Sequence, residues 1–122
     1  MNFWDITLWE RMYIDLWSVP HFLFGLIAFY LLQKAGMKKV SAFFITIFFA
    51  ILWELLELLT PIQEYLTNIL TDIIFAGLGF YFFALIEKTN IKNSKKIFKI
   101  SFWLFIFFCV LGYLAAFIRN FF

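Results

Sequence analysis

The chain has 122 residues, of which 65% are hydrophobic, 25% are aromatic and only 15% are charged, and its formal net charge is +2. A soluble domain is about half apolar and a quarter charged, so this composition excludes an ordinary soluble globular protein. The apolar runs are continuous rather than alternating, which argues against a membrane β-barrel and predicts a single-domain, all-α integral membrane protein over residues 1–122.

The first predicted element, residues 3–16, is an amphipathic helix that lies in the membrane interface. At 100° per residue, its apolar side chains gather on one side and most of its charged side chains on the other. We expect Trp4, Trp9 and Trp17 to anchor the chain at headgroup depth. This segment has no basic leader region and no small-residue cleavage site, so it is not expected to be a signal peptide.

Four apolar segments follow, and each is close to the ~20 residues that a helix needs to cross ~30 Å of hydrocarbon. Ser18 is the expected N-cap of the first segment, and Pro61 ends the second. The first segment is short, and we expect it to be tilted or extended by its neighbours. We predict a bundle of four transmembrane helices at residues 17–33, 40–59, 65–86 and 97–118.

The basic residues are distributed very unevenly. Eight of the ten are lysines that flank the connections after the first and third apolar segments: Lys34, Lys38, Lys39, Lys88, Lys92, Lys95, Lys96 and Lys99. Cytoplasmic loops are enriched in lysine and arginine, so we expect these connections in the cytoplasm and both chain termini outside. Because this bias serves orientation, no nucleic-acid partner is expected.

Five polar residues stand inside or at the ends of the apolar segments: His21, Glu54, Glu57, Asn68 and Asp72. Ionisable groups in membrane segments are costly and rare, and they mark functional sites by default. On the predicted topology, all five lie at the end of the bundle away from the lysines. The two glutamates are i,i+3 and Asn68 and Asp72 are i,i+4, so each pair shares a helix face.

Small residues continue these faces. His21 shares a face with Gly25 and Ala28, where small side chains allow close helix approach. Ala76, Gly77 and Gly79 form a similar surface on the third helix. Three helices are therefore expected to bring a histidine, three carboxylates and an amide to one depth.

Three carboxylates in one partly buried pocket cannot all be ionised at low cost unless a cation compensates them. The available groups are protonated His21, Arg11, Arg119, a bound metal ion or a cationic ligand.

Four hypotheses account for the cluster. A structural cluster would hold the helices together by hydrogen bonds of ~0.6–2 kcal/mol each. A catalytic site would use His21 with Glu57 or Asp72, beside Glu54, as acid and base on a lipid headgroup or lipid-linked substrate. A divalent metal ion would be held by carboxylates and one imidazole, from His21, Glu54, Glu57 and Asp72. The fourth is a binding or transport site for a polar ligand, a headgroup or a proton, with ligand-binding residues Asn68, Gln63, Ser18 and Gly25.

A resemblance adds to this interpretation. The stretches at residues 17–25, 53–57 and 68–72 contain His-x-x-x-Gly, Trp-Glu-x-x-Glu and Asn-x-x-x-Asp. Together they resemble the uncharacterised branches of the VanZ-like superfamily of small bacterial membrane proteins, over roughly residues 15–83. The resemblance implies the bacterial cytoplasmic (inner) membrane and a role in the cell envelope. Unlike the better-known VanZ pattern, this chain has no arginine between Glu57 and Asp72, so no phosphate-holding role is assigned there.

The sequence therefore predicts a VanZ-like envelope protein whose outward-facing polar pocket binds or modifies a lipid or lipid-linked headgroup. The contrasting hypothesis is a structural or accessory membrane subunit with no chemistry of its own. Membrane lipids are the expected partners, and an outer surface so rich in aromatic residues also suits a homo-oligomer.

Overall fold

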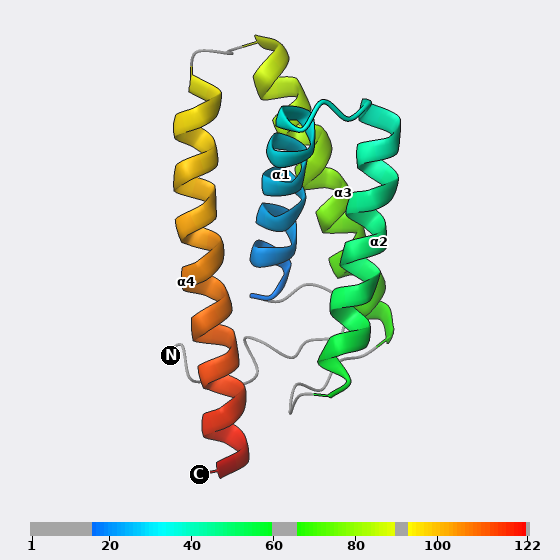
Figure 1. Ribbon diagram of the computed structural model, residues 1–122. Coiled ribbons are helices and arrows are strands. Elements are labelled where there is room, and N and C mark those ends of the chain that lie inside the picture. Colours follow the sequence, from blue (N-terminus) through cyan, green and yellow to red (C-terminus); the bar gives the residue numbers. More distant parts are fainter. Residues whose placement is uncertain (1–15, 60–65, 90–92, 122) are drawn as a thin grey trace.

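The computed structural model describes residues 16–59, 66–89 and 93–121. Four helices pack side by side as a bundle (Figure 1): α1 (Ser18–Lys34), α2 (Lys39–Glu57), α3 (Leu66–Thr89) and α4 (Ser94–Phe121). Helices α1 and α3 run in one direction and α2 and α4 in the other. The predicted all-α class is confirmed. The predicted interfacial helix at residues 3–16 and the candidate residue Gln63 lie outside the described residues.

Three of the four helices, α2, α3 and α4, are long and apolar enough to cross a membrane. Helix α1 has 17 residues and spans ~25 Å at 1.5 Å per residue, so it is not one of these three. The prediction of four transmembrane helices is therefore confirmed in part: α2, α3 and α4 have the length and composition of membrane spans.

The end of α1 is set by Gly36, which adopts a left-handed backbone conformation with φ of 82°. The Gly36 N–H donates to the carbonyl of Gln33 at 3.0 Å, and the Met37 N–H donates to that of Leu32 at 3.1 Å. These two bonds form a Schellman motif, which satisfies the last carbonyls of a helix and which glycine adopts without steric cost. The start of α1 also differs from the prediction, because Ser18 is its first helical residue and Trp17 occupies the N-cap position.

Helix α1 lies among the other three and contacts each of them (Figure 1). More than half of its residues are buried. The other helices expose many large apolar side chains, as helices facing lipid do; examples are Phe44, Phe48, Ile74, Leu85, Trp103 and Phe107. The interior of this small bundle is therefore built around α1, while α2, α3 and α4 form its apolar surface.

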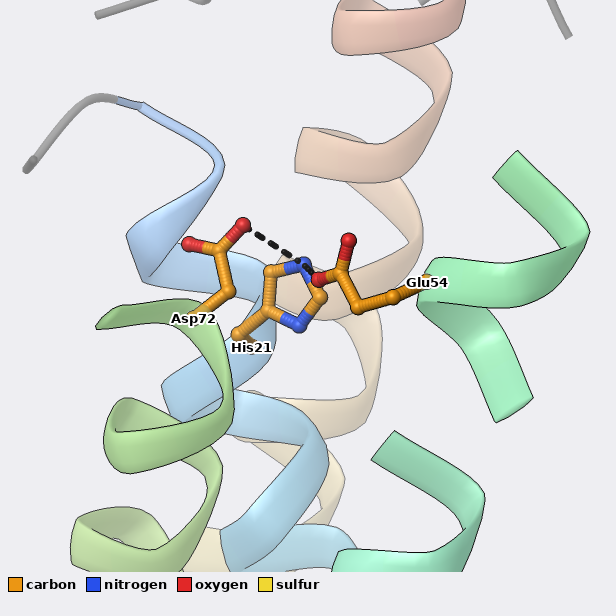
Figure 2. Close-up of side chains that lie close together, drawn as sticks. All are labelled: His21, Glu54 and Asp72. Atoms are coloured by element: carbon orange, nitrogen blue, oxygen red, sulfur yellow. Dashed lines mark ion pairs between the residues drawn. The ribbon is translucent and has the colours of Figure 1, made fainter. Parts of the chain in front are cut away.

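Two glycines let the backbones of α1 and α3 touch. A Cβ atom at Gly25 would overlap the carbonyl oxygen of Ala76 and lie 2.9 Å from the backbone nitrogen of Phe80. A Cβ atom at Gly79 would overlap the carbonyl oxygen of Phe22 in the same way. This close approach brings the first turn of α1 against the second turn of α3, where the side chains of His21 and Asp72 meet (Figure 2). The expectation that small residues permit close approach is confirmed for Gly25 and Gly79.

Gly77 belongs to a different contact. A Cβ atom there would lie 3.5 Å from the Phe43 ring and 3.7 Å from Ile47 Cδ1, which is ordinary van der Waals distance. Gly77 thus faces α2, and the small residues of α3 divide between two neighbours instead of forming one surface.

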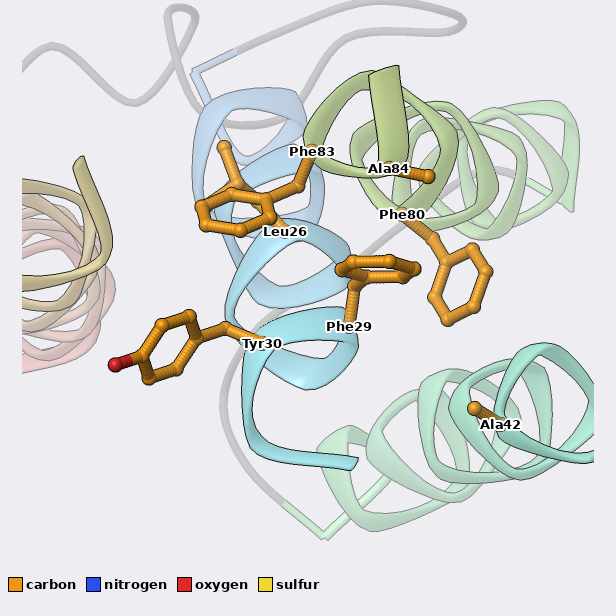
Figure 3. Packing of buried hydrophobic residues seen from close by; sticks show 7 residues of the cluster. All are labelled: Leu26, Phe29, Tyr30, Ala42, Phe80, Phe83 and Ala84. Carbon is orange, nitrogen blue, oxygen red and sulfur yellow. The ribbon is translucent and has the colours of Figure 1, made fainter. Parts of the chain in front are cut away.

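An aromatic core fills the half of the bundle nearer the lysines (Figure 3). Its buried members come from α1, α2 and α3: Leu26, Phe29, Tyr30, Ala42, Phe80, Phe83 and Ala84. The Phe29 and Phe80 rings meet edge to face, with centroids 4.9 Å apart, an arrangement that aromatic quadrupoles favour. Tyr30 extends toward α4, where its ring stacks on Phe98 with centroids 4.2 Å apart. This core joins α1 to all three neighbours on the lysine side of the polar turns.

The glycine contact generates a prediction about stability. Gly25→Ala and Gly79→Ala should each lower the free energy of unfolding by about 1–3 kcal/mol, because the new methyl group meets backbone atoms that cannot rotate away. Gly77→Ala, the matched control, should be neutral or stabilising, since alanine favours a helix by up to ~1 kcal/mol over glycine. Thermal unfolding in one detergent measures all three. Equal effects at the three positions would contradict the backbone contact.

Candidate functional site

Three buried titratable side chains from three helices meet at the end of the bundle away from the lysines (Figure 2). His21 of α1 places its Nε2 atom 3.3 Å from Oε1 of Glu54 on α2 and 3.3 Å from Oδ2 of Asp72 on α3. The exposed fractions of these side chains are 0%, 6% and 0%. One imidazole nitrogen is therefore shared between two carboxylates from different helices. We call these three residues the His–Glu–Asp cluster.

Local structure explains why these side chains converge. His21 follows Pro20 in the first turn of α1, Glu54 lies in the last turn of α2, and Asp72 lies near the start of α3. Gly25 is one turn beyond His21 on the same face of α1, so the α1–α3 backbone contact lies directly next to the cluster. The buried residues of α2 before Glu54 are small, and they turn this face toward the bundle: Ala42, Thr46 and Ala50.

The imidazole ring is held by aromatic packing. The Trp53 ring stacks on the His21 ring, with centroids 4.0 Å apart and an interplanar angle of 25°. Trp17 meets Trp53 edge-on at 6.5 Å and Tyr113 of α4 at 5.1 Å. Because Trp53 precedes Glu54, one turn of α2 supplies both a carboxylate and a ring contact to the same histidine.

Trp17 corrects an expectation from the sequence. It was expected to be an interface anchor, but its exposed fraction is 1% and it packs against Ala115 and Ala116 of α4. The two adjacent alanines leave room for an indole, so the ring turns into the bundle. The adjacent alanines are the feature of the sequence that could have indicated this packing. Nothing comparable in the sequence indicates that Trp17 contacts Trp53 and Tyr113.

The direction of the histidine nitrogens limits what the cluster can be. Neither His21 ring nitrogen makes a hydrogen bond with another residue in the described part of the chain, although Nε2 lies close to both carboxylates. An imidazole nitrogen has one N–H or one lone pair, in the ring plane, and can aim it at one acceptor only. Nε2 instead lies at the same distance, 3.3 Å, from two oxygens without bonding to either, which suits a shared proton or a metal ion.

The other predicted site residues that the structure describes are Ser18, Gly25, Glu57 and Asn68. Ser18, Glu57 and Asn68 are buried at the same end of the bundle, with exposed fractions of 4%, 4% and 0%. Gly25 is part of the helix contact described above. Among the described residues, the group whose donor atoms lie within metal-binding reach of one another consists of His21, Glu54 and Asp72, without Glu57.

The distribution of charge is as uneven in space as in sequence. Every lysine whose side chain is described lies at the helix ends opposite the cluster, near the termini of α1 and α3 and the starts of α2 and α4. Arg119 stands in the last turn of α4, and its side chain is not among those described; Arg11 lies outside the described residues. The described lysines therefore do not compensate the charge of the cluster.

Comparisons with protein-family models, curated proteins and solved structures found no match. The resemblance to VanZ-like proteins stays a prediction, and the functional argument depends on the cluster itself.

The ring contacts generate a second prediction. Trp53→Leu should lower the free energy of unfolding by about 1–3 kcal/mol, because His21 loses its stacked neighbour and a gap opens beside Trp17 and Phe105. Trp103→Leu is the matched control, since Trp103 is 68% exposed on α4. Thermal unfolding in detergent compares the two variants. A loss for Trp103→Leu as large as for Trp53→Leu would mean that the stacked arrangement is not what holds this region.

Proposed function

We propose that the protein is a multi-pass protein of the bacterial cytoplasmic membrane whose His–Glu–Asp cluster binds the polar headgroup of a lipid or lipid-linked molecule. The observation that supports this most directly is the convergence of His21, Glu54 and Asp72 from three helices on one buried point. Ionisable side chains inside a membrane bundle are costly and rare. Those that occur almost always face the bundle interior, and they mark ligand or ion sites by default.

The proposed topology has all four helices crossing the membrane. Helix α1 is short, but it is enclosed by three longer helices, so it need not match the hydrocarbon thickness by itself. The lysine-bearing helix ends lie in the cytoplasm, and the cluster lies toward the outer leaflet. The predicted interfacial helix at residues 3–16 then lies on the outer surface, near the same headgroup layer.

The chemistry of the cluster selects its ligand. Two carboxylates accept hydrogen bonds from the hydroxyl or ammonium groups of a headgroup, and charge-assisted bonds of this kind are about twice as strong as neutral ones. His21 can take or give a proton beside them, which would allow acid–base chemistry on a bound hydroxyl. A bare phosphate, in contrast, would be repelled by Glu54 and Asp72 unless a cation lies between them.

Complete burial favours one alternative, in which the cluster only joins the helices. Buried polar contacts between membrane helices contribute ~0.6–2 kcal/mol each, and His21 and Asp72 are fully buried. Stability and binding must therefore be measured on the same variants.

The binding proposal generates a third prediction. Glu54→Gln and Asp72→Asn keep the side-chain size and should weaken headgroup binding at least ~10-fold, the equivalent of losing one charge-assisted hydrogen bond. Glu87→Gln makes the same chemical change at the lysine end and should leave binding unchanged. Co-purified lipid quantified by mass spectrometry, with the melting temperature of each variant, gives both readouts. A variant with a lower melting temperature, but with as much lipid per folded chain as the unaltered protein, would support the structural alternative.

The topology generates a fourth prediction. In a Cys109→Ser background, Lys38→Cys should react with a membrane-impermeant maleimide only after the cells are opened, because position 38 is expected in the cytoplasm. Glu64→Cys, in the connection between α2 and α3, should react in intact spheroplasts. The reverse labelling pattern would invert the proposed orientation and place the cluster at the cytoplasmic leaflet.

A further inference from the structure

We infer that His21, Glu54 and Asp72 are the protein ligands of one divalent transition-metal ion, with Zn²⁺ or Mn²⁺ as the chemical class. This inference rests on the proposed function in one respect, since the ion would be the group that contacts the headgroup. The coordination itself is argued from the geometry of the three side chains.

The distances match the edges of a coordination shell. Zinc binds imidazole nitrogen at 2.0–2.1 Å and carboxylate oxygen at 2.0–2.2 Å, so two such donors at a tetrahedral angle lie ~3.3–3.5 Å apart. The Nε2 atom of His21 is 3.3 Å from an oxygen of Glu54 and 3.3 Å from an oxygen of Asp72. All three donor atoms lie within 4.8 Å of one another, so an ion can be reached by each of them with small side-chain rotations.

The histidine provides an independent observation. Its side chain is completely buried, and its Nε2 atom lies 3.3 Å from one oxygen of each carboxylate without forming a hydrogen bond to either (Figure 2). A hydrogen bond would align the N–H with one oxygen. A metal ion placed along the nitrogen lone pair would have both oxygens beside it, which agrees with the two equal distances of 3.3 Å. The stacked ring of Trp53 holds the imidazole in this orientation.

The charge of the site also fits a divalent ion. A neutral imidazole, two carboxylates and one ion of charge +2 sum to zero. In a protein interior the desolvation of two carboxylates is a large cost, and a divalent ion between them would offset this cost at short distance. The described lysines lie at the opposite end of the bundle.

The donor set selects the class of metal. Imidazole suits zinc and other transition ions, whereas Mg²⁺ and Ca²⁺ prefer sites built from oxygen alone. Three protein ligands leave a fourth position for a water molecule or a ligand oxygen, as in catalytic rather than structural zinc sites. The oxygen in this fourth position can belong to the phosphate of a headgroup. The ion offsets the repulsion between that phosphate and the carboxylates of Glu54 and Asp72.

Metal stoichiometry tests the inference directly. Full-length protein is purified in detergent, stripped with a chelator, incubated with ZnCl₂ or MnCl₂, desalted and measured by elemental analysis. We expect about one ion per chain and a higher melting temperature with either metal than with MgCl₂. Glu54→Gln and Asp72→Asn should weaken binding at least ~10-fold, and His21→Ala should abolish it.

Two controls make the assignment specific. Glu87→Gln and Glu57→Gln should retain full stoichiometry, because Glu87 lies at the lysine end and Glu57 lies outside the three-donor group. Loss of metal in either control, or retention in both Glu54→Gln and Asp72→Asn, would overturn this ligand set. Co²⁺ bound to the unaltered protein should show the visible absorption of a low-coordinate N,O site, which needs no variant to fold. Spectra of hydrated octahedral Co²⁺ alone would also overturn it.

The outcome separates the metal from the headgroup. If the unaltered protein binds no metal but its lipid binding still depends on Asp72, the inference fails and the proposed function stands. If metal binds with the expected ligands but co-purified lipid is unaffected by every variant, the coordination stands and the headgroup proposal fails.

Discussion

The contact between the backbones of α1 and α3 is the constraint on which the rest of the bundle depends. Gly25 and Gly79 each lie against the carbonyl oxygen of a residue on the opposite helix, where a single methyl group would not fit. This approach draws the shortest helix into the middle and brings the first turn of α1 against α3. Once His21 and Asp72 are neighbours, α2 completes the cluster with Glu54. The polar cluster is therefore a consequence of close packing by small residues.

Much of the site could be predicted from the sequence because two simple periodicities apply. The lysines indicate which ends of the apolar segments lie on the same side of the bundle. Helical spacing indicates which polar residues share a helix face. What spacing could not decide was whether Glu54 or Glu57 meets His21, because both are buried and only the rotation of α2 distinguishes them. That rotation follows from Ala42, Thr46 and Ala50, whose four-residue spacing continues directly to Glu54. The pattern was present in the sequence, but only the packing shows which stripe faces α1.

Other features depend on three-dimensional context that local pattern does not contain. A tryptophan at the edge of an apolar segment usually lies in the interface, yet Trp17 is buried because Ala115 and Ala116 leave space for it on a helix almost a hundred residues away. The stacking of Trp53 on His21 joins side chains of α1 and α2, and no spacing rule connects them. These features depend on pairs of helices, whereas the periodicities describe single helices.

The parallel pairing of α1 and α3 has a consequence for biogenesis. Because α1 and α3 are parallel, the chain must run back along the bundle as α2 before α3 can begin. Helix α1 therefore leaves the ribosome well before α3, its main partner, has been synthesised. During that interval His21 has neither Glu54 nor Asp72 beside it, and a polar group facing lipid is costly. Helices that are independently stable insert first and associate afterwards, which fits α2, α3 and α4 better than the short α1. Helix α1, the innermost of the four described helices, is thus made before its main partner and is among the last of the four to reach its final environment.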